Sequence, residues 1–315
     1  MSRVVVTDYT FPDLAQEQAA AGADFQAFQC RTAEDVAAAV ARADVAVVQF
    51  APFGPAAAAA MKPGGTVIRY GVGYNNIDLD AARTHGLRVG YVPDYCADEV
   101  ADHTAAMALT MLRKLPMMDA SVKRGDWAAV KVAKPMKPFG QTVFGFFGLG
   151  QIGRAVLSRL KGFGFRFVAT DPMLTVADAM AMGVAKVTSD ALLAQADIIS
   201  LHAPATAETM GFFNTERLFR MQRHAMIINS ARGQLIVEDD LADALTRGVI
   251  AGAALDVFQV EPLAADSKLR LAPNLLLTPH AAWYSETAIH RLQHLVAEDI
   301  ARALRGAAPR KPVPM

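Results

Sequence analysis

Short apolar runs alternate with segments of helical periodicity along the first 98 residues. The runs predict strands near Val4–Thr7, Phe25–Phe28, Val45–Phe50, Thr66–Tyr70 and Arg88–Val92. Thr32 and Asp78 are predicted N-caps of the intervening helices, and Gly86 is a predicted helix stop. Repeated strand–helix units with short connections predict a parallel, doubly wound sheet.

The rest of the chain repeats this alternation. Strands are predicted at Val143–Phe147, Phe165–Thr170, Ala185–Val187, Ile198–Leu201, Ala225–Asn229, Gly252–Leu255 and Leu275–Leu277. Long helices are predicted over Ala97–Lys114 and Ser285–Arg305. We expect Gly125–Pro138 to be an extended connector whose lysines are solvated, and Gly306–Met315 to be irregular. The predicted fold class is therefore α/β, with two doubly wound parallel sheets.

Composition narrows the class of protein. The length of 315 residues suggests about two domains. Lysine plus arginine and aspartate plus glutamate number 31 each, so nothing indicates a nucleic-acid or membrane partner. The only cysteines are Cys30 and Cys96, too few and too far apart to suggest a disulfide framework. A strand-like run directly follows Arg3, and no apolar stretch reaches membrane-spanning length, so we expect a soluble, cytoplasmic protein.

A glycine-rich turn joins the Val143–Phe147 run to a helical pattern, reading Gly148-Leu149-Gly150-Gln151-Ile152-Gly153. Such a turn lets a pyrophosphate approach the backbone at the start of a helix. Asp171 ends the next strand, about 20 residues beyond the turn, where a carboxylate can bind both ribose hydroxyls of NAD and repel the extra phosphate of NADP. The alternative is a plain turn, with Asp171 as a helix cap ahead of Pro172.

Three polar stretches follow strands in the second half: Asn229–Gly233, Asp256–Pro262 and Thr278–Trp283. Because the carboxyl ends of parallel strands meet at one sheet edge, an arginine, a carboxylate and a histidine should converge there. His290 and His294 lie one helical turn apart, but no third ligand is evident, so we expect helix surface and no metal site.

These residue types suit hydride transfer to or from a 2-oxo acid. Arg232 can hold a carboxylate and polarise a carbonyl, and His280 can give a proton to the carbonyl oxygen. Glu261 can orient and charge the imidazole, and Asp256 can orient the nicotinamide. Taken singly, each residue also has a structural interpretation: Arg232 as an ion pair, Glu261 as an ordinary loop acid and His280 as a locally satisfied histidine. The loop Gly71–Asn76 can present amides to a carboxylate or be a simple turn.

Over nearly its whole length the chain resembles the D-2-hydroxyacid dehydrogenase family. The matching pieces are Gly71–Asp78, Gly148–Gly153 with Asp171, Asn229–Gly233, Gly252–Asp256, Glu261-Pro262 and Thr278–His280. Gln234, Ile236 and Gln259 depart from the family pattern, but none of them removes a catalytic group. Glu261 argues against formate dehydrogenase activity, since those relatives pair their histidine with glutamine.

The resemblance implies catalysis by Arg232, Glu261 and His280, with His280 as proton donor in reduction. It implies cofactor contacts at Thr104, Gly148, Gly150, Gln151, Ile152, Gly153, Asp171, His202, Ala203, Pro204, Ser230, Ala231, Arg232, Asp256 and His280. It implies substrate contacts at Val72, Gly73, Arg232, His280 and Trp283. It further implies a substrate domain of residues 1–98 and 286–315, an NAD-binding domain of residues 99–285, and a homodimer.

Within the family, His280–Glu286 looks most like the C-terminal binding protein branch. Trp283 would favour a substrate with an apolar or thioether side chain. The main prediction is an NAD-dependent oxidoreductase acting on a 2-oxo acid or a D-2-hydroxy acid. The alternatives are an NADH-sensing, co-repressor-like binding protein with weak activity and a glyoxylate or hydroxypyruvate reductase.

Overall fold

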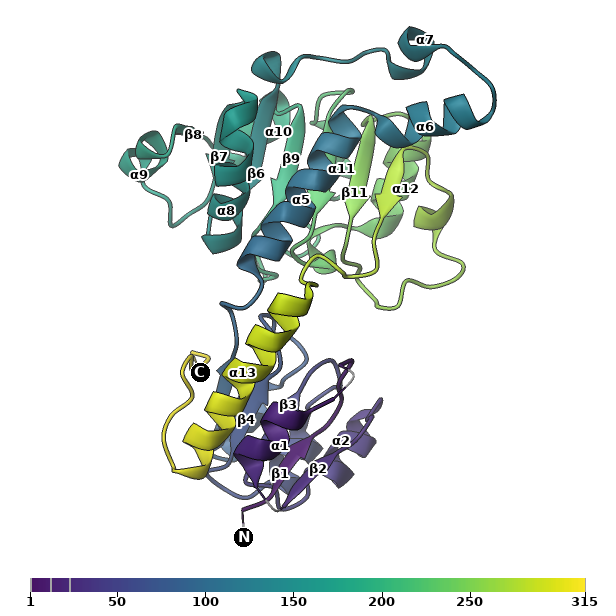
Figure 1. Ribbon diagram of the computed structural model, residues 1–315. Coiled ribbons are helices and arrows are strands. Elements are labelled where there is room, and N and C mark those ends of the chain that lie inside the picture. Colours follow the sequence, from purple (N-terminus) through teal and green to yellow (C-terminus); the bar gives the residue numbers. More distant parts are fainter. Residues whose placement is uncertain (1, 12, 23, 315) are drawn as a thin grey trace. The chain divides into compact units, whose positions relative to one another are not determined.

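The structure is a computed structural model that describes residues 2–11, 13–22 and 24–314. The chain divides into two compact units (Figure 1). The first comprises Met1–Cys96 and Tyr284–Met315, and the second comprises Ala97–Trp283. The predicted ranges 1–98 and 286–315 include four residues, 1, 12, 23 and 315, that lie outside the described residues.

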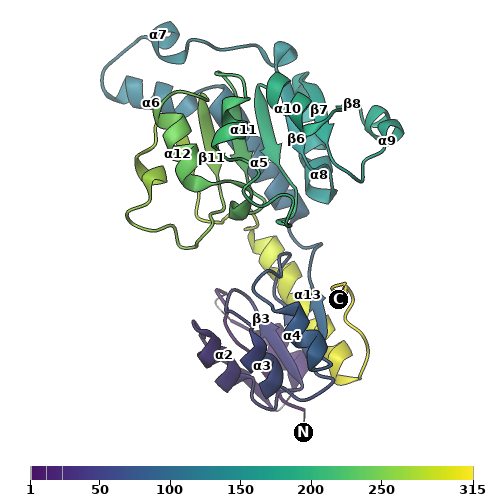
Figure 2. The ribbon, with the colours of Figure 1, turned by 180° about the vertical axis from the view of Figure 1, so that it is seen from behind.

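The first unit is a five-stranded parallel sheet in the order β2-β1-β3-β4-β5. Its strands are β1 (Val4–Val6), β2 (Phe25–Ala27), β3 (Val45–Val48), β4 (Thr66–Arg69) and β5 (Arg88–Tyr91). Its helices are α1 (Ala15–Ala21), α2 (Ala33–Ala39), α3 (Pro55–Ala60), α4 (Leu79–Thr84) and α13 (Glu286–Leu304). The two views show α1 and α13 on one face of the sheet and α2, α3 and α4 on the other (Figures 1 and 2).

Local sequence explains where the helices of the first unit begin. The Thr32 side chain accepts a hydrogen bond from the amide of Asp35 in a capping box. The Asp78 side chain caps α4 by accepting from the amide of Ala81. Ser285 caps α13. After α13 the chain returns to the edge strand β5, where Pro312 bridges Gly90. The predicted irregular end therefore covers a sheet edge that would otherwise be unpaired.

The second unit is a seven-stranded parallel sheet in the order β12-β11-β10-β9-β6-β7-β8. Its strands are β6 (Val143–Phe147), β7 (Arg166–Thr170), β8 (Val184–Lys186), β9 (Ile198–Leu201), β10 (Met226–Asn229), β11 (Gly252–Leu255) and β12 (Leu275–Leu277). The strand order reverses between β6 and β9, which is where ligands bind in open α/β sheets.

The helices of the second unit are α5 (Ala97–Leu112), α6 (Leu115–Lys123), α7 (Ala129–Ala133), α8 (Gln151–Leu160), α9 (Val176–Ala181), α10 (Ser189–Gln195), α11 (Thr215–Phe219) and α12 (Glu238–Thr246). Short 3₁₀ turns are η1 (Phe139–Gln141), η2 (Lys161–Phe163), η3 (Gly233–Leu235) and η4 (Lys268–Leu271). Helices α5 and α8 cover one sheet face, whereas α10, α11 and α12 cover the other (Figures 1 and 2). Each face has its own apolar core, with Met107 of α5 in one and Leu192 of α10 in the other.

The predicted α/β class with two parallel sheets is confirmed, and the predicted strands agree with the structure to within one or two residues. The extended connector over Gly125–Pro138 is wrong in part, because Ala129–Ala133 forms helix α7. The prolines and lysines around this segment favoured the prediction of an extended chain, although its alanines favour a helix. Among the described residues, no helix is long and apolar enough to cross a membrane.

A buried carboxylate fastens the end of that connector to the large sheet. Asp197 is 5% exposed, and its Oδ1 accepts a hydrogen bond from Lys137 Nζ at 2.6 Å. Its Oδ2 accepts from the backbone amide of Val143 at 2.7 Å, and Oδ1 also contacts His224. Burial alone would raise the pKa of Asp197, but these partners together lower it. Lys137 is exposed, as expected of the connector lysines, with 48% of its side chain accessible, but it also pairs with Asp197.

We expect Asp197→Ala to lower the free energy of unfolding by about 1–3 kcal/mol at pH 7, because the buried Val143 amide loses its acceptor. Asp119→Ala is the matched control, since the Lys123–Asp119 pair has nearly the same length, 2.7 Å, but is exposed. It should cost less than about 1 kcal/mol. Because the folded pKa of Asp197 is depressed, its contribution is complete above the ordinary carboxyl range and is lost as pH falls through the folded value. Urea unfolding measures both variants, and equal losses would contradict the buried anchor.

Candidate active site

The three glycines of the turn after β6 differ in how much space the protein leaves for a side chain. Gly148 has φ +88°, and a Cβ there would lie 2.8 Å from the Ala203 amide nitrogen, so the protein itself requires glycine. A Cβ on Gly153 would lie 3.1 Å from Gly148 O, which keeps α8 close to the strand. Gly150 has an ordinary φ of −76°, and a Cβ there would meet nothing within 4 Å. No steric contact within the protein requires glycine at position 150, whereas a ligand lying against the backbone would require it.

The amino end of α8 suits a phosphate. Gly150 is its N-cap and offers no side-chain hydrogen bond to the first amides of the helix. Gln151 is exposed and Ile152 partly exposed at this end. Unsatisfied amides and the positive end of a ten-residue helix together attract an anion. The residues present therefore fit the pyrophosphate of a dinucleotide.

Asp171 follows β7 and braces the glycine turn. Its Oδ2 accepts from the Leu149 amide at 2.8 Å, and its Oδ1 accepts from the Met173 amide at 2.8 Å. It does not cap α9, whose N-cap is Thr175. The carboxylate is partly exposed, and each oxygen has a second lone pair. Asp171 can therefore hold the turn and still accept hydrogen bonds from ribose hydroxyls.

The His202–Pro204 stretch after β9 packs beneath the same turn. His202 Nε2 lies 2.8 Å from Ser200 Oγ, and the ring lies 5.9 Å from the ring of Phe146. Burial lowers the pKa of His202 to about 3, so the imidazole is neutral at pH 7. Ala203 is partly exposed and Pro204 exposed. These features are compatible with a wall beside a cofactor.

The loop that carries Arg232 is held by the last residue of β10. Asn229 is fully buried, its Nδ2 donates to Arg232 O at 2.9 Å, and its Oδ1 accepts from the Ala231 amide at 3.0 Å. Gly233 packs against the backbone of the neighbouring loop, because a Cβ there would lie 1.9 Å from Phe258 C. No other residue type permits this approach, which sets the Arg232 loop directly against the loop that leads to Glu261.

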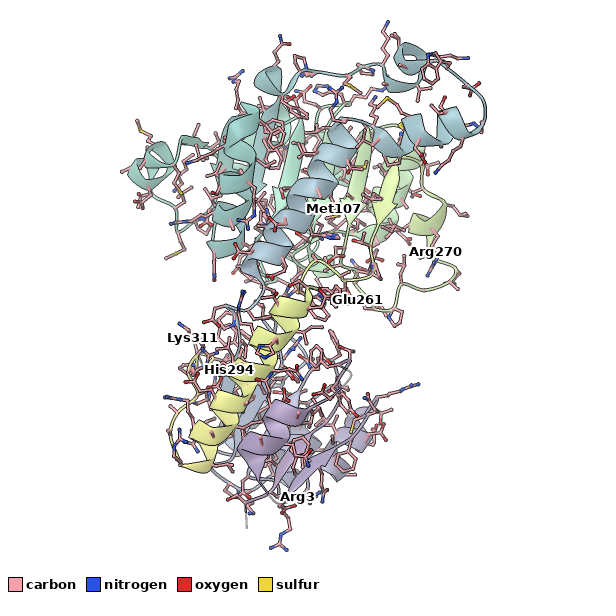
Figure 3. All side chains as sticks on the ribbon, viewed as in Figure 1. Arg3, Met107, Glu261, Arg270, His294 and Lys311 are labelled. Carbon is pink, nitrogen blue, oxygen red and sulfur yellow. The ribbon has the colours of Figure 1, made fainter. Side chains whose placement is uncertain are left out.

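Glu261 and His280 form a close pair. His280 Nδ1 lies 2.6 Å from Glu261 Oε2, and the Phe258 amide donates to Glu261 Oε1 at 2.9 Å. Burial alone would raise the pKa of Glu261, but His280, the Phe258 amide and the charge of Arg232 together lower it. The side chains of His280 and Glu261 keep 37% and 32% of their exposure. Figure 3 shows Glu261 at the edge of the second unit where its strands end.

Other predicted contacts are buried within the second unit. Thr104 on α5 is fully buried, and its hydroxyl lies 2.6 Å from Ser230 Oγ and donates to Val100 O. Asp256 is also fully buried, and both its carboxylate oxygens accept hydrogen bonds from residues 278–282. Direct contacts of Thr104 and Asp256 with a cofactor stay predictions. In the structure, Thr104 contacts the loop after β10 and Asp256 holds the loop after β12.

Val72 and Gly73 belong to the first unit, where they follow β4 and are partly exposed. Gly71 precedes them with φ +143°, and its carbonyl accepts from the Val92 amide at 3.0 Å. Arg69, which was not among the predicted site residues, is a mostly buried cation whose Nη1 donates to Tyr70 O beside this loop. The sequence signal that could have identified Arg69 is an arginine at the end of a strand-like run. Trp283 is partly buried at the end of the second unit.

The family model for the D-isomer specific 2-hydroxyacid dehydrogenase NAD-binding domain matches residues 105–282. The chain belongs to this family. It is 38% identical over 248 residues to the glyoxylate reductase of Korarchaeum cryptofilum, covering 77% of this chain and 74% of that enzyme. It is 38% identical over 270 residues to the D-3-phosphoglycerate dehydrogenase of Mycobacterium bovis, covering 85% of this chain. It spans only 51% of that longer enzyme.

A solved structure of this family carries ligands. The D-lactate dehydrogenase of Aquifex aeolicus, complexed with NAD and lactic acid, is 26% identical, and each chain covers 96% of the other with a TM-score of 0.87. The members of this family are NAD-dependent oxidoreductases, and the second unit carries their NAD-binding domain. The residues around Gly150 and Asp171 fit that cofactor.

We expect Gly150→Ala to raise the dissociation constant for NADH at least about tenfold, a loss of about 1.4 kcal/mol. Its melting temperature should fall only slightly, since alanine costs about 1 kcal/mol or less at this N-cap. Gly148→Ala should destabilise the protein itself because of its left-handed φ and its contact with Ala203. Gly162→Ala, whose Cβ meets nothing within 4 Å, is the control. NADH fluorescence titration with thermal melts tests this, and unchanged affinity for Gly150→Ala would refute a cofactor at the turn.

Proposed function

We propose that the chain reduces a 2-oxo acid to a D-2-hydroxy acid, and catalyses the reverse reaction, with Arg232, Glu261 and His280 as its catalytic residues. The observation that carries this proposal is the 2.6 Å contact of His280 with Glu261, partly exposed and within an NAD-binding domain. Bound NADH supplies the hydride that adds to the carbonyl carbon. The protein's residues then bind the acid and deliver the proton.

His280 is the proton donor in this proposal. With Nδ1–H donated to Glu261, the ring's other nitrogen, Nε2, holds the proton that passes to the carbonyl oxygen. The hydrogen bond to Glu261 fixes the ring's orientation and leaves Nε2 to face the substrate. In the reverse reaction, the neutral imidazole takes the proton from the hydroxyl group. Glu261 stays ionised throughout, consistent with its lowered pKa.

Arg232 is the group that binds the substrate carboxylate and polarises the carbonyl. Its guanidinium stays charged, offers five N–H donors and is partly exposed. Its Nη1 donates to Ala231 O at 2.5 Å, which restrains the side chain. The amides of Val72 and Gly73 are the proposed second carboxylate contact. Asp171 is the proposed basis of a preference for NADH over NADPH.

The substrate is proposed to be a small 2-oxo acid without a phosphate. Trp283 would favour an apolar or thioether side chain, as in the C-terminal binding protein branch that His280–Glu286 resembles. Glyoxylate and hydroxypyruvate are the second candidates, because a glyoxylate reductase is among the relatives. NADH oxidation at 340 nm against a panel from glyoxylate to 4-methylthio-2-oxobutyrate and phenylpyruvate separates them. Tight NADH binding with slow turnover of every acid would favour an NADH-sensing role instead.

We expect His280→Ala to lower kcat by about 10²–10⁴-fold, the usual contribution of a general acid, while NADH affinity changes less than about threefold. His294→Ala is the control, an exposed histidine on α13 marked in Figure 3. Steady-state kinetics on the best acid of the panel, with NADH titration, measures both variants. Turnover of His280→Ala near the wild-type rate would remove this residue from the mechanism.

A homodimer and a cytoplasmic location are also proposed. An arm formed by residues 115–133, which includes α6 and α7, leaves the body of the second unit (Figure 1). It exposes Trp127 by 92%, Val130 by 78%, Val122 by 54% and Leu115 by 51%. Exposed apolar side chains grouped in this way are typical of an interface. A second copy can bury both arms symmetrically. Two buried cysteines suit a reducing compartment.

We expect Trp127→Glu combined with Val130→Glu to convert the dimer to a monomer, because two charges would have to be buried. Leu271→Glu is the control, since Leu271 is 91% exposed but lies outside the arm. Analytical ultracentrifugation across a range of protein concentrations gives the mass. A monomeric wild-type protein, or a dimer unaffected by the arm variant, would contradict this interface.

A further inference from the structure

Helix α5 touches both loops that carry the proposed catalytic residues. Thr104 reaches Ser230, beside the Arg232 loop, at 2.6 Å. The preceding residue, His103, reaches Thr278 at the start of the His280 loop, with 3.1 Å between His103 Nε2 and Thr278 Oγ1. The proposed mechanism uses neither His103 nor Thr278. Both contacts lie within the second unit.

The hydrogen bonds that link His103, Thr278 and Asp256 can have only one direction. A carboxylate can only accept, so the Thr278 hydroxyl donates to Asp256 Oδ1, at 2.6 Å. The one proton of that hydroxyl is then used, and Thr278 Oγ1 accepts from His103. His103 therefore carries a proton on Nε2. The same nitrogen lies 3.7 Å from Asp256 Oδ1, so its positive N–H dipole also faces the carboxylate.

Asp256 is also hydrogen-bonded to the backbone on both sides of the His280 side chain. Its Oδ1 accepts from the Ala281 amide and its Oδ2 from the Ala282 amide, both at 2.9 Å. Its own carbonyl accepts from the His280 amide at 2.8 Å. His280 has φ +52°, a left-handed conformation that a residue with a Cβ adopts only under constraint from its surroundings. The loop is thus held on both sides of the catalytic histidine.

We propose that His103 is a positioning residue for the reaction. It donates to Thr278, which holds Thr278 and Asp256 in the geometry that keeps His280 in its left-handed conformation with Nδ1 on Glu261. His103 does not touch the substrate in this proposal. Its effect reaches the chemistry only through Thr278 and Asp256. The inference rests on the proposed role of His280.

The test compares a variant that removes the donor with one that keeps it. His103→Leu removes the hydrogen bond, whereas His103→Gln places an amide N–H close to the position of Nε2. We expect His103→Leu to lower kcat about tenfold with NADH affinity within about twofold, and His103→Gln to stay within about threefold of wild type. Thr278→Val should lower kcat similarly, and the double variant with His103→Leu should be no worse than Thr278→Val alone. His85→Leu, an exposed histidine at the end of α4, is the control.

A second measurement needs no substrate. Hydrogen–deuterium exchange of peptides covering residues 278–283 reports the amides of Ala281 and Ala282. It should be at least about fivefold faster in His103→Leu and near wild type in His103→Gln. Unchanged exchange in His103→Leu would overturn the inference, even if the chain turned over none of the acids tested. Equal losses in both His103 variants would also overturn it, since the ring's shape and not its donor would then matter.

Discussion

All seven strands of the large sheet run in the same direction, so every loop after a strand leaves from one edge. This constraint brings Arg232, Glu261 and His280 together from three separate stretches of sequence. The closest approach is at Gly233, which lies so near the Phe258 backbone that a single added carbon would meet it at 1.9 Å. Parallel strands bring the loops to one place, and this glycine lets two of them touch.

Loops at such an edge need anchors, and the chain uses carboxylates placed where strands end. Asp171 holds the Leu149 amide, and Asp256 holds the Ala281 and Ala282 amides. In the first unit, Asp8 after β1 accepts from the Gln49, Phe50 and Ala51 amides after β3. In each case, a carboxylate after one strand accepts from the backbone after the neighbouring strand. Hydrogen bonds to an ionised acceptor are stronger than neutral ones, which suits them to fixing an irregular segment.

The sequence was sufficient for the architecture and for the convergence of the three proposed catalytic residues. Apolar runs identified the strands, and parallel topology then required Arg232, Glu261 and His280 to share an edge. Sequence alone could not assign the role of Asp256. An aspartate that faces a nicotinamide and one that accepts a hydrogen bond from the Ala281 amide cannot be told apart from the sequence. The pairing of Lys137 with Asp197 and the burial of Arg69 were missed for a related reason. Only the folded chain shows that Lys137 meets Asp197 and that Arg69 is buried beside Tyr70.

Two residues of the site have identities that the fold alone does not explain. Alanine would fit at Gly150 without meeting any atom of the protein within 4 Å. At position 280 the backbone has φ +52°, where a non-glycine residue costs about 1–2 kcal/mol, so glycine would fit better than histidine. The proposed function accounts for a glycine that no steric contact requires and for a histidine against the backbone preference. In that proposal, the glycine leaves room for a cofactor against the backbone, and the histidine places an imidazole beside Glu261 as the proton donor.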